Sequence, residues 1–195
     1  ITLLTDFGLQ DGYVGVMKGV IWGICPDAHI ADITHTIAPQ NIRQAAYILA
    51  RSAPYFPPGA VHIAVVDPGV GSTRRPLLVT TPQAAFVGPD NGLFTFALDE
   101  PGARAWKLDR PDYWLPDISR TFHGRDIFAP VAAHLACGVA PYVLGSPIAD
   151  PARLTPLLAE RHGNNHIIGH VIHVDRFGNL ISNVPATWVA AGNWT

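Results

Sequence analysis

Short apolar runs that stop abruptly at an aspartate set the strongest limit on how this chain of 195 residues can fold. Ile1–Thr5 leads directly into Asp6-Phe7-Gly8, and the run 61–66 leads into Asp67-Pro68-Gly69. Runs of this composition and length are typical of buried strands, while apolar residues recur at helical spacing from Tyr13 to Ile24. The alternation of strands with helices from residue 1 to about residue 145 predicts a layered α/β/α domain with a central, mostly parallel sheet.

The same patterns predict the other elements and the domain boundary. Further strands are predicted at 77–80, 84–87 and 103–108, and further helices at 42–53, with Asn41 as N-cap, and at 126–137, closed by Gly138. Four prolines then punctuate a connector, beyond which 166–175 and 180–184 alternate like antiparallel strands. We therefore expect an N-terminal α/β domain at 1–146, a linker at 147–165 and the beginning of a C-terminal domain at 166–195.

Composition limits the partners that the protein can have. Only 14% of the residues are charged and 48% are hydrophobic, which favours a surface partly covered by another subunit and hence a homo-oligomer. A formal net charge of -2 provides no basic footprint for nucleic acid, so a small-molecule partner is expected.

No apolar stretch reaches the length of a membrane span and no signal sequence is visible, so a cytoplasmic location without membrane contact is predicted. Cys25 lies in an apolar helical pattern and Cys137 near a predicted helix end, so both are interpreted as buried reduced thiols of a cytosolic protein.

An acid and a cation follow the apolar run 61–66. Gly69 and Gly71 allow the loop after Asp67 to fold back, so that the guanidinium of Arg74 can meet the carboxylate and orient it. A surface ion pair on a tight loop is an equally good interpretation. A phosphate cradle is a weak one, because both the P-loop lysine and the dinucleotide-binding glycine spacing are missing.

Two further polar residues stand where α/β proteins keep their chemistry, at a helix start and a strand end. His123 lies in a glycine-containing turn before a helix, although a lone histidine is more often structural than catalytic. Asp6 follows the first strand, where it can reach the hydroxyl pair of a ligand or simply form a turn. Asp11 is the better candidate for the N-cap of the first helix.

The remaining polar clusters are more ambiguous. Asp90-Asn91-Gly92 is predicted to be a turn, with a ligand contact as the alternative. His166 and His170 share one face of a predicted strand while His173 points away, and no metal site is predicted. Asp175–Asn179 combines a carboxylate, an aromatic ring and an amide, which could hold an amine and a heterocycle but alone favours a hairpin loop.

Six motifs, taken in their order along the chain, carry a specific family resemblance. They are Leu4–Gly8, Met17–Gly19, Val66–Gly71 with Arg74-Arg75, Gly88–Gly92, Thr121–Asp126 and Asp175–Asn179. Together they resemble the S-adenosylmethionine hydroxide adenosyltransferase family, which is related to the fluorinase and chlorinase, up to about Asn183. The resemblance implies hydrolysis of S-adenosylmethionine to adenosine and methionine without a metal or cofactor. It also implies an α/β domain followed by an antiparallel β-barrel, assembled as a homotrimer with sites between subunits. The family continues beyond residue 195, so either the chain or its adenosine pocket is expected to be incomplete.

The resemblance also assigns roles residue by residue. It implies that Asp67, Arg74 and His123 act on the attacking water and that Asp6 binds the ribose hydroxyls. It further implies that Asp175 binds the methionine amine and that Phe177 and Asn179 contact the adenine.

Three positions separate hydrolysis from halogenation. The halide-using relatives carry tyrosine at the position of Asp67, and the fluorinase also has threonine for Val70 and serine for Gly124. A carboxylate repels halide and can accept a proton from water, which favours hydrolysis. A chlorinase-like halogenase and a non-catalytic adenosine- or S-adenosylmethionine-binding protein are the alternatives.

Overall fold

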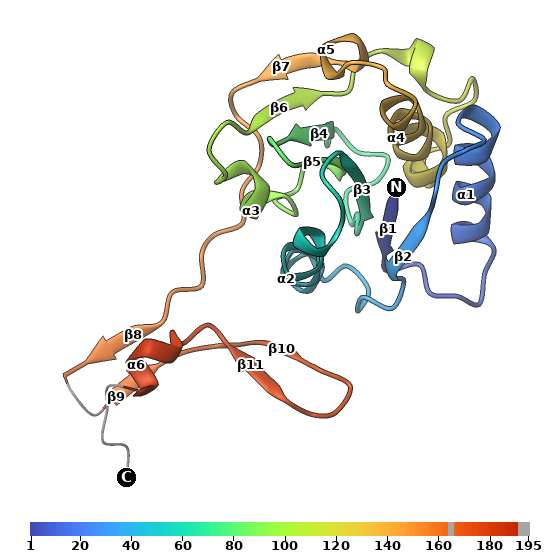
Figure 1. The fold of residues 1–195 in the computed structure, drawn as a ribbon. Coiled ribbons are helices and arrows are strands. Elements are labelled where there is room, and N and C mark those ends of the chain that lie inside the picture. Colours follow the sequence, from blue (N-terminus) through green and yellow to red (C-terminus); the bar gives the residue numbers. More distant parts are fainter. Residues whose placement is uncertain (164–165, 191–195) are drawn as a thin grey trace. The chain divides into compact units, whose positions relative to one another are not determined.

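The computed structural model describes residues 1–163 and 166–190, and its contacts divide the chain into two compact units, Ile1–Leu154 and Thr155–Thr195. The first unit contains a seven-stranded sheet in the order β2-β1-β3-β5-β4-β6-β7 (Figure 1). The strands of this sheet are β1 (Thr2–Thr5), β2 (Ala31–Thr34), β3 (Ala60–Val65), β4 (Pro76–Thr80), β5 (Ala84–Pro89), β6 (Arg104–Lys107) and β7 (Ser146–Ile148). The unit boundary at Leu154 lies inside the segment 147–165 that we expected to be a linker.

Most of this sheet is parallel. The strands β2, β1, β3 and β5 are parallel neighbours, whereas β4 pairs antiparallel with both β5 and β6. Because β6 therefore shares the direction of β5, only β4 and β7 run the opposite way. The predicted mostly parallel sheet is confirmed. The edge strand β2 was not predicted, because its sequence Ala-Asp-Ile-Thr is half exposed and lacks an apolar run.

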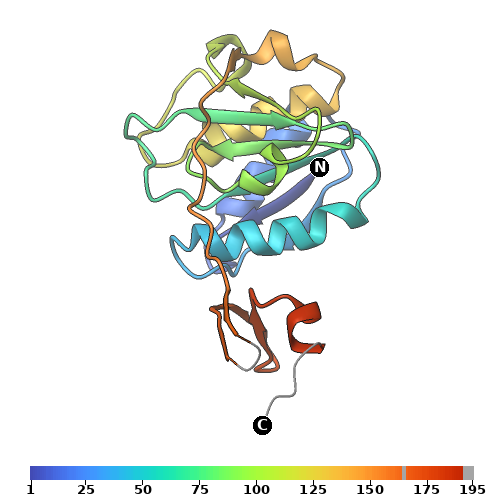
Figure 2. The same ribbon diagram turned by 90° about the vertical axis from the view of Figure 1, so that its left-hand side faces the viewer.

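Helices cover both faces of the sheet. Leu3 faces a core built with α1 and α4, whereas its neighbour Leu4 faces a second core built with α2 and α3, as the alternation of side chains along a strand requires. Figure 2 shows α2 lying along one face, with the sheet between it and the opposite helices. The helices of this unit are α1 (Tyr13–Ile24), α2 (Ile42–Ser52), α3 (Thr95–Leu98), α4 (Ala129–Ala136) and α5 (Pro141–Leu144), with single turns η1 (Ala53–Tyr55), η2 (Pro111–Tyr113) and η3 (Gly124–Phe128).

Helix ends match the sequence in two cases, at Asn41 and at Gly138, which has φ 92° after α4, and differ in two others. The Oδ1 atom of Asn41 accepts a hydrogen bond from the Gln44 amide at 3.0 Å, which confirms the predicted N-cap of α2. The prediction of Asp11 as N-cap of α1 was wrong: Gly12 takes that position and no side chain caps the helix. The helix predicted from residue 126 opens instead with the π-helical turn η3, which ends two residues before Pro130, a residue without a backbone N–H to donate.

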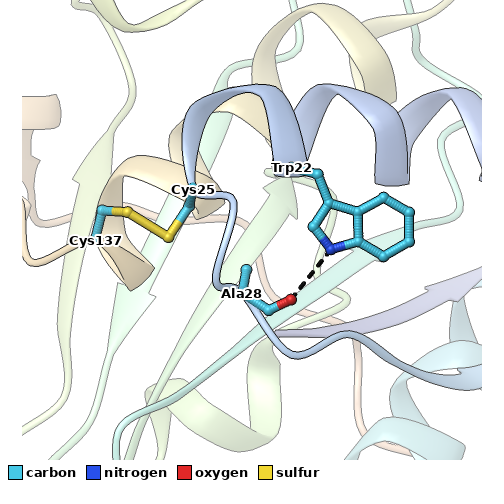
Figure 3. Close-up of a disulfide and its surroundings, with 4 residues drawn as sticks. All are labelled: Trp22, Cys25, Ala28 and Cys137. Carbon is cyan, nitrogen blue, oxygen red and sulfur yellow. Dashed lines mark hydrogen bonds between the residues drawn. A yellow bond between two sulfur atoms is a disulfide. The ribbon is translucent and has the colours of Figure 1, made fainter.

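The prediction of two reduced thiols was wrong, because Cys25 and Cys137 form a disulfide (Figure 3). Cys25 ends α1 and Cys137 ends α4, and their Cα atoms are 6.0 Å apart although 112 positions separate them in sequence. Close by, the indole Nε1 of Trp22 donates to the carbonyl of Ala28 at 3.2 Å. Sequence could not reveal the bond, because only the packing of α1 against α4 brings the two sulfur atoms together. The predicted cytoplasmic location rested partly on these thiols and stays a prediction.

The second unit consists of two antiparallel hairpins and a short helix, as described up to residue 190. Its elements are β8 (Glu160–His162), β9 (His166–Ile168), β10 (Val171–Val174), β11 (Leu180–Ser182) and α6 (Ala186–Ala190). β8 pairs with β9 and β10 pairs with β11, both antiparallel, which confirms the predicted antiparallel character. The predicted strand 166–175 is split, however: it ends at Ile168 and resumes at Val171, and the two parts, β9 and β10, belong to different hairpins. The last five residues of the expected C-terminal domain, 191–195, lie outside the described residues. In the part of the chain described, no helix has the length and apolar character needed to cross a membrane.

Candidate active site

Asp67 and Arg74 form a buried ion pair at the end of β3. Nε of Arg74 lies 3.1 Å from Oδ1 of Asp67, and Nη2 lies 2.5 Å from Oδ2. Both side chains are less than a tenth exposed. A two-point contact between two buried groups fixes the carboxylate in direction as well as in position. The interpretation as a surface ion pair is therefore wrong.

His123 shares the same guanidinium. Nη2 of Arg74 also lies 2.9 Å from Nδ1 of His123. Because a guanidinium only donates, Nδ1 must accept, and the hydrogen of the neutral ring resides on Nε2. Burial lowers the pKa of His123 and the charge of Arg74 lowers it further, whereas Asp67 and Asp126 act in the opposite direction. The neutral Nε2–H form is thus the one that this site stabilises.

Backbone contact brings the two halves of the site together. Gly71 has φ +73°, and a Cβ at this position would overlap with the carbonyl oxygen of Arg120. Only glycine combines this conformation with so close an approach. Gly124 is buried as well, since a Cβ there would lie 3.2 Å from Sδ of Met17 and 3.3 Å from the Phe122 ring. The loop after β3 and the segment before η3 therefore pack directly on each other.

Asp126 holds the segment that carries His123. Its side chain is fully buried, Oδ2 accepts from the Ser119 amide at 2.7 Å, and Oδ1 accepts from Nε of Arg125. Burial acts to raise the pKa of Asp126, but the hydrogen bonds from Arg125 and Ser119 outweigh it and the pKa is lowered. The hydroxyl of Ser119 in turn accepts from the Phe122 amide at 2.9 Å. The sequence placed Asp126 in a motif but gave it no role.

A pocket of 300 Å³ opens beside these residues. Asp67 and His123 line it together with Asp6, Phe7 and Phe122. Three sequence-predicted residues thus meet in one cavity, with Arg74 bonded to two of them. A larger hollow of 640 Å³ lies beside β6 and β7, but its lining contains no acid or histidine that could handle a proton.

The same pocket contains residues that no motif had indicated. Gln40 and Pro39 line it ahead of α2, and the Gln40 amide donates to Oδ2 of Asp6 at 2.8 Å. Among the described non-glycine residues, Gln40 alone has a positive φ, 64°. Such a conformation is uncommon outside glycine and is often found at functional sites. The sequence Pro-Gln-Asn does not predict this positive φ, because the conformation of Gln40 is set by the path of the loop in the folded protein.

Asp175, Phe177 and Asn179 lie in the second unit, in the loop of the β10–β11 hairpin. Oδ1 of Asp175 accepts from the amides of Phe177 and Asn179, both at 2.9 Å, and Oδ2 accepts from the Asn179 side chain at 2.6 Å. These hydrogen bonds, those from Asn179 foremost, lower the pKa of Asp175. The Phe177 side chain is almost fully exposed. The predicted hairpin loop is confirmed, and the ring at its tip is available to a partner or ligand.

Two family models match the chain, one over each part. The N-terminal domain of S-adenosylmethionine hydroxide adenosyltransferases matches residues 1–145, and the C-terminal domain of the same family matches residues 169–195. The chain belongs to the S-adenosylmethionine hydroxide adenosyltransferase family. The six motifs that suggested this resemblance therefore identified the family correctly.

Relatives within the hydroxide adenosyltransferase family are similar over nearly the whole chain. An (R)-S-adenosyl-L-methionine hydrolase from Thermus thermophilus is 45% identical, over 94% of this chain and 74% of that protein. A protein of the same name from Methanocaldococcus jannaschii is 43% identical, over 94% of this chain and 66% of that protein. A fluorinase from Nocardia brasiliensis is more distant, at 27% identity over 96% of this chain and 71% of that protein.

Two solved structures share the fold of this chain. The crystal structure of an uncharacterized conserved protein from Thermotoga maritima superimposes with a TM-score of 0.90 at 40% identity, over 97% of this chain and 73% of that one. A conserved hypothetical protein from Thermus thermophilus gives a TM-score of 0.73 at 45% identity, over 93% of this chain and 70% of that one. The α/β fold read from the sequence is thus confirmed.

Metal ligation is a separate question from family membership. Across residues 1–163 and 166–190, no three histidine, cysteine, aspartate or glutamate side chains converge as a metal site would require. His166 instead lies beside His162, with ring centroids 5.7 Å apart, on the β8–β9 hairpin. That the reaction needs no cofactor stays a prediction.

Proposed function

We propose that this protein hydrolyses S-adenosyl-L-methionine to adenosine and L-methionine by in-line attack of water on the ribose C5′ atom. The observation that carries the proposal is that Asp67 and His123, both bonded to Arg74, line a 300 Å³ pocket. Membership of the family and 42–45% identity to proteins named (R)-S-adenosyl-L-methionine hydrolase support it.

The substrate carries a good leaving group, so the main requirement on the site is to position the attacking water. The C5′–S bond breaks with its electron pair going to sulfur, so the cationic sulfonium leaves as the neutral thioether of methionine. No acid is needed to protonate this leaving group, and no metal is needed to stabilise it. What the site must provide is a water molecule held in line behind C5′ and an acceptor for its proton.

Asp67 is the proton acceptor in this proposal. Its carboxylate faces the pocket, whereas the basic Nδ1 of His123 already accepts from Arg74. The remaining ring nitrogen of His123 carries a hydrogen and can only donate. We therefore assign His123 to orienting Arg74 and the water, and Asp67 to removing the water proton as the C5′–O bond forms. Proton removal contributes on the order of 10²–10⁴-fold to the rate.

The binding residues are proposed on the family resemblance and on their exposure. Asp6 lines the pocket with the reactive groups and would accept hydrogen bonds from the ribose hydroxyls. Asp175 would bind the methionine amine, and Phe177 with Asn179 would contact the adenine. The exposed ring of Phe177 and the small charged fraction of the chain support a homotrimer with sites between subunits. We keep the cytoplasm as the proposed location.

The decisive experiment is a product analysis in water enriched in oxygen-18. We expect adenosine that carries the label at its 5′ oxygen, in a one-to-one ratio with methionine. Parallel incubations with chloride or fluoride should yield no 5′-halo-5′-deoxyadenosine, because the Asp67 carboxylate repels halide. Asp67→Asn should lower kcat on the order of 10²–10⁴-fold with little change in KM. Binding of S-adenosylmethionine without any product would instead support a non-catalytic binding protein.

A further inference from the structure

Phe128, the last residue of the turn η3, is a buried aromatic ring that lies outside all six sequence motifs. Its side chain has no exposed surface, and the Cζ atom of Arg74 lies over the ring, 5.4 Å from its centroid. A cation over an aromatic face is attracted by the ring quadrupole, and the attraction is strongest where both groups are shielded from water. The Arg74 side chain is only 7% exposed, so this contact is of the stronger kind.

The guanidinium of Arg74 also has a donor that its hydrogen bonds leave unused. Nε and Nη2 donate to Asp67, and Nη2 donates to Nδ1 of His123. Nη1 is buried as well, but it has no hydrogen-bond partner among the residues that the structure describes. Burying such a donor is costly unless another group compensates for the lost water. The negative face of the Phe128 ring compensates for part of this loss.

The π-helical geometry of η3 brings two residues to the same guanidinium. His123 is the N-cap of η3 and Phe128 is its last residue, five positions further on. In an α-helix, side chains five positions apart point roughly 140° apart around the axis. A π turn instead closes i→i+5 hydrogen bonds, here from the Ala129 amide to the Gly124 carbonyl, and brings such side chains toward one side. One short segment can therefore contact Arg74 twice.

Arg74 connects the Phe128 ring to the reactive groups. Asp67 and His123 line the 300 Å³ pocket, and Arg74 bonds to both of them. If the guanidinium shifts, the carboxylate of Asp67, which is the proposed proton acceptor, turns with it. A misplaced acceptor raises the barrier to attack by water but removes no group that binds the substrate. Loss of the ring should therefore lower kcat and leave KM nearly unchanged.

We propose that Phe128 is a positioning residue for proton removal, because its ring holds the guanidinium of Arg74 and, through it, the carboxylate of Asp67. This inference rests on the proposed function, which makes Asp67 the base. A ring that only fills the core would contribute to folding stability alone. A positioning ring also contributes to kcat, and it does so only while Arg74 is present.

The first test compares Phe128→Leu with the matched control Phe86→Leu. Phe86 is 2% exposed and belongs to the core on the other face of the sheet. Both substitutions remove a ring from a closed core, so both should lower the midpoint of urea unfolding. We expect Phe128→Leu to lower kcat about tenfold with KM within about twofold, as the loss of a desolvated cation–π contact allows. Phe86→Leu should keep kcat within about twofold of the original.

The second test asks whether the ring acts through Arg74. In the variant Arg74→Met the guanidinium is absent, so adding Phe128→Leu should change the remaining kcat by less than about twofold. Effects that fail to add in this way identify two residues that act together. Phe128→Met also removes the aromatic face, and it replaces Phe128→Leu in both tests if that variant does not fold.

Two results would overturn the inference. One is a kcat in Phe128→Leu that equals that of Phe86→Leu, which would leave the ring a purely structural part of the core. The other is the same tenfold loss with and without the Arg74 guanidinium. If the unmodified protein releases no adenosine, the proposed function itself fails, a result distinct from equal kcat values in active variants.

Discussion

Nη2 of Arg74 lies 2.9 Å from Nδ1 of His123, so a guanidinium and not a proton occupies the basic nitrogen of the histidine. The sequence left open whether Asp67 or His123 takes the proton from water. The contact favours Asp67, because His123 could bind a proton at Nδ1 only after losing its bond to Arg74. The resulting imidazolium would also face a second cation.

Replacing His123 by asparagine distinguishes a role as proton acceptor from a role as hydrogen-bond acceptor for Arg74. In the variant His123→Asn the side-chain amide oxygen can still accept from Arg74, but an amide has no basic nitrogen. We expect His123→Asn to retain kcat within about tenfold of the original, while His123→Ala, which leaves the guanidinium short of one acceptor, falls much further. Rates of adenosine release measure both. Equal losses on the order of 10²–10⁴-fold in the two variants would identify His123 as the base after all.

The pH dependence of turnover should follow the neutral form of His123. Burial, then the charge of Arg74, lowers its pKa below the ordinary value of 6.5, so the ring stays neutral at pH 7. We expect kcat/KM to be level above pH 6.5 and to fall only at more acidic pH. Once Nδ1 of His123 is protonated, it and Nη2 of Arg74 are both donors, so the hydrogen bond between them is lost. Folding stability should decline in the same direction, because below pH 6.5 the unfolded chain binds the proton more readily than the folded one. A loss of activity centred above pH 6.5 would contradict this assignment.

A single methyl group at Gly71 should disrupt the site. The Cβ of Gly71→Ala would overlap with the Arg120 carbonyl, and alanine disfavours the φ of +73°. We expect a loss of about 1–3 kcal/mol in unfolding free energy and a clear fall in kcat, since the two loops that carry Arg74 and His123 must move apart. Gly12→Ala is the matched control, because a Cβ there meets no atom within 4 Å and the backbone has negative φ. Urea unfolding and initial rates compare the two variants.

The parts of the fold that local patterns determine could be predicted from the sequence. The strand β3 and the helix α2 follow from an apolar run and from an N-cap at Asn41, which depend on neighbours along the chain. The motifs also indicated Asp67, Arg74 and Asp6 as site residues. What they could not supply was the depth at which the ion pair is buried, because the groups that contact Arg74, His123 and the ring of Phe128, come from a distant part of the chain.

Features that arise from distant contacts were missed or misjudged. Gln40 lines the pocket in a conformation that no local signal encodes, and Asp90 was expected to form a turn, with a ligand contact as the alternative. Asp90 instead forms a buried pair with Arg75, and its bond to the Ala152 amide depends on a segment sixty-two positions away. In each case the deciding partner comes from a different element of the fold, so periodicity and turn chemistry give no information about it.

The disulfide between Cys25 and Cys137 should stabilise the protein without being needed for turnover. It closes a loop of 112 positions, and bonds of this kind typically add about 2–4 kcal/mol by restricting the unfolded chain. It lies at the far end of α1 from Tyr13, whose ring packs against Phe7 and Phe122 beside the pocket. We therefore expect Cys25→Ser with Cys137→Ser to lower the urea midpoint while leaving kcat and KM nearly unchanged at 25 °C. Dithiothreitol should shift the original protein to the same midpoint and leave the double variant unaffected. Two titratable thiols with an unchanged midpoint after reduction would show that the bond contributes nothing to stability.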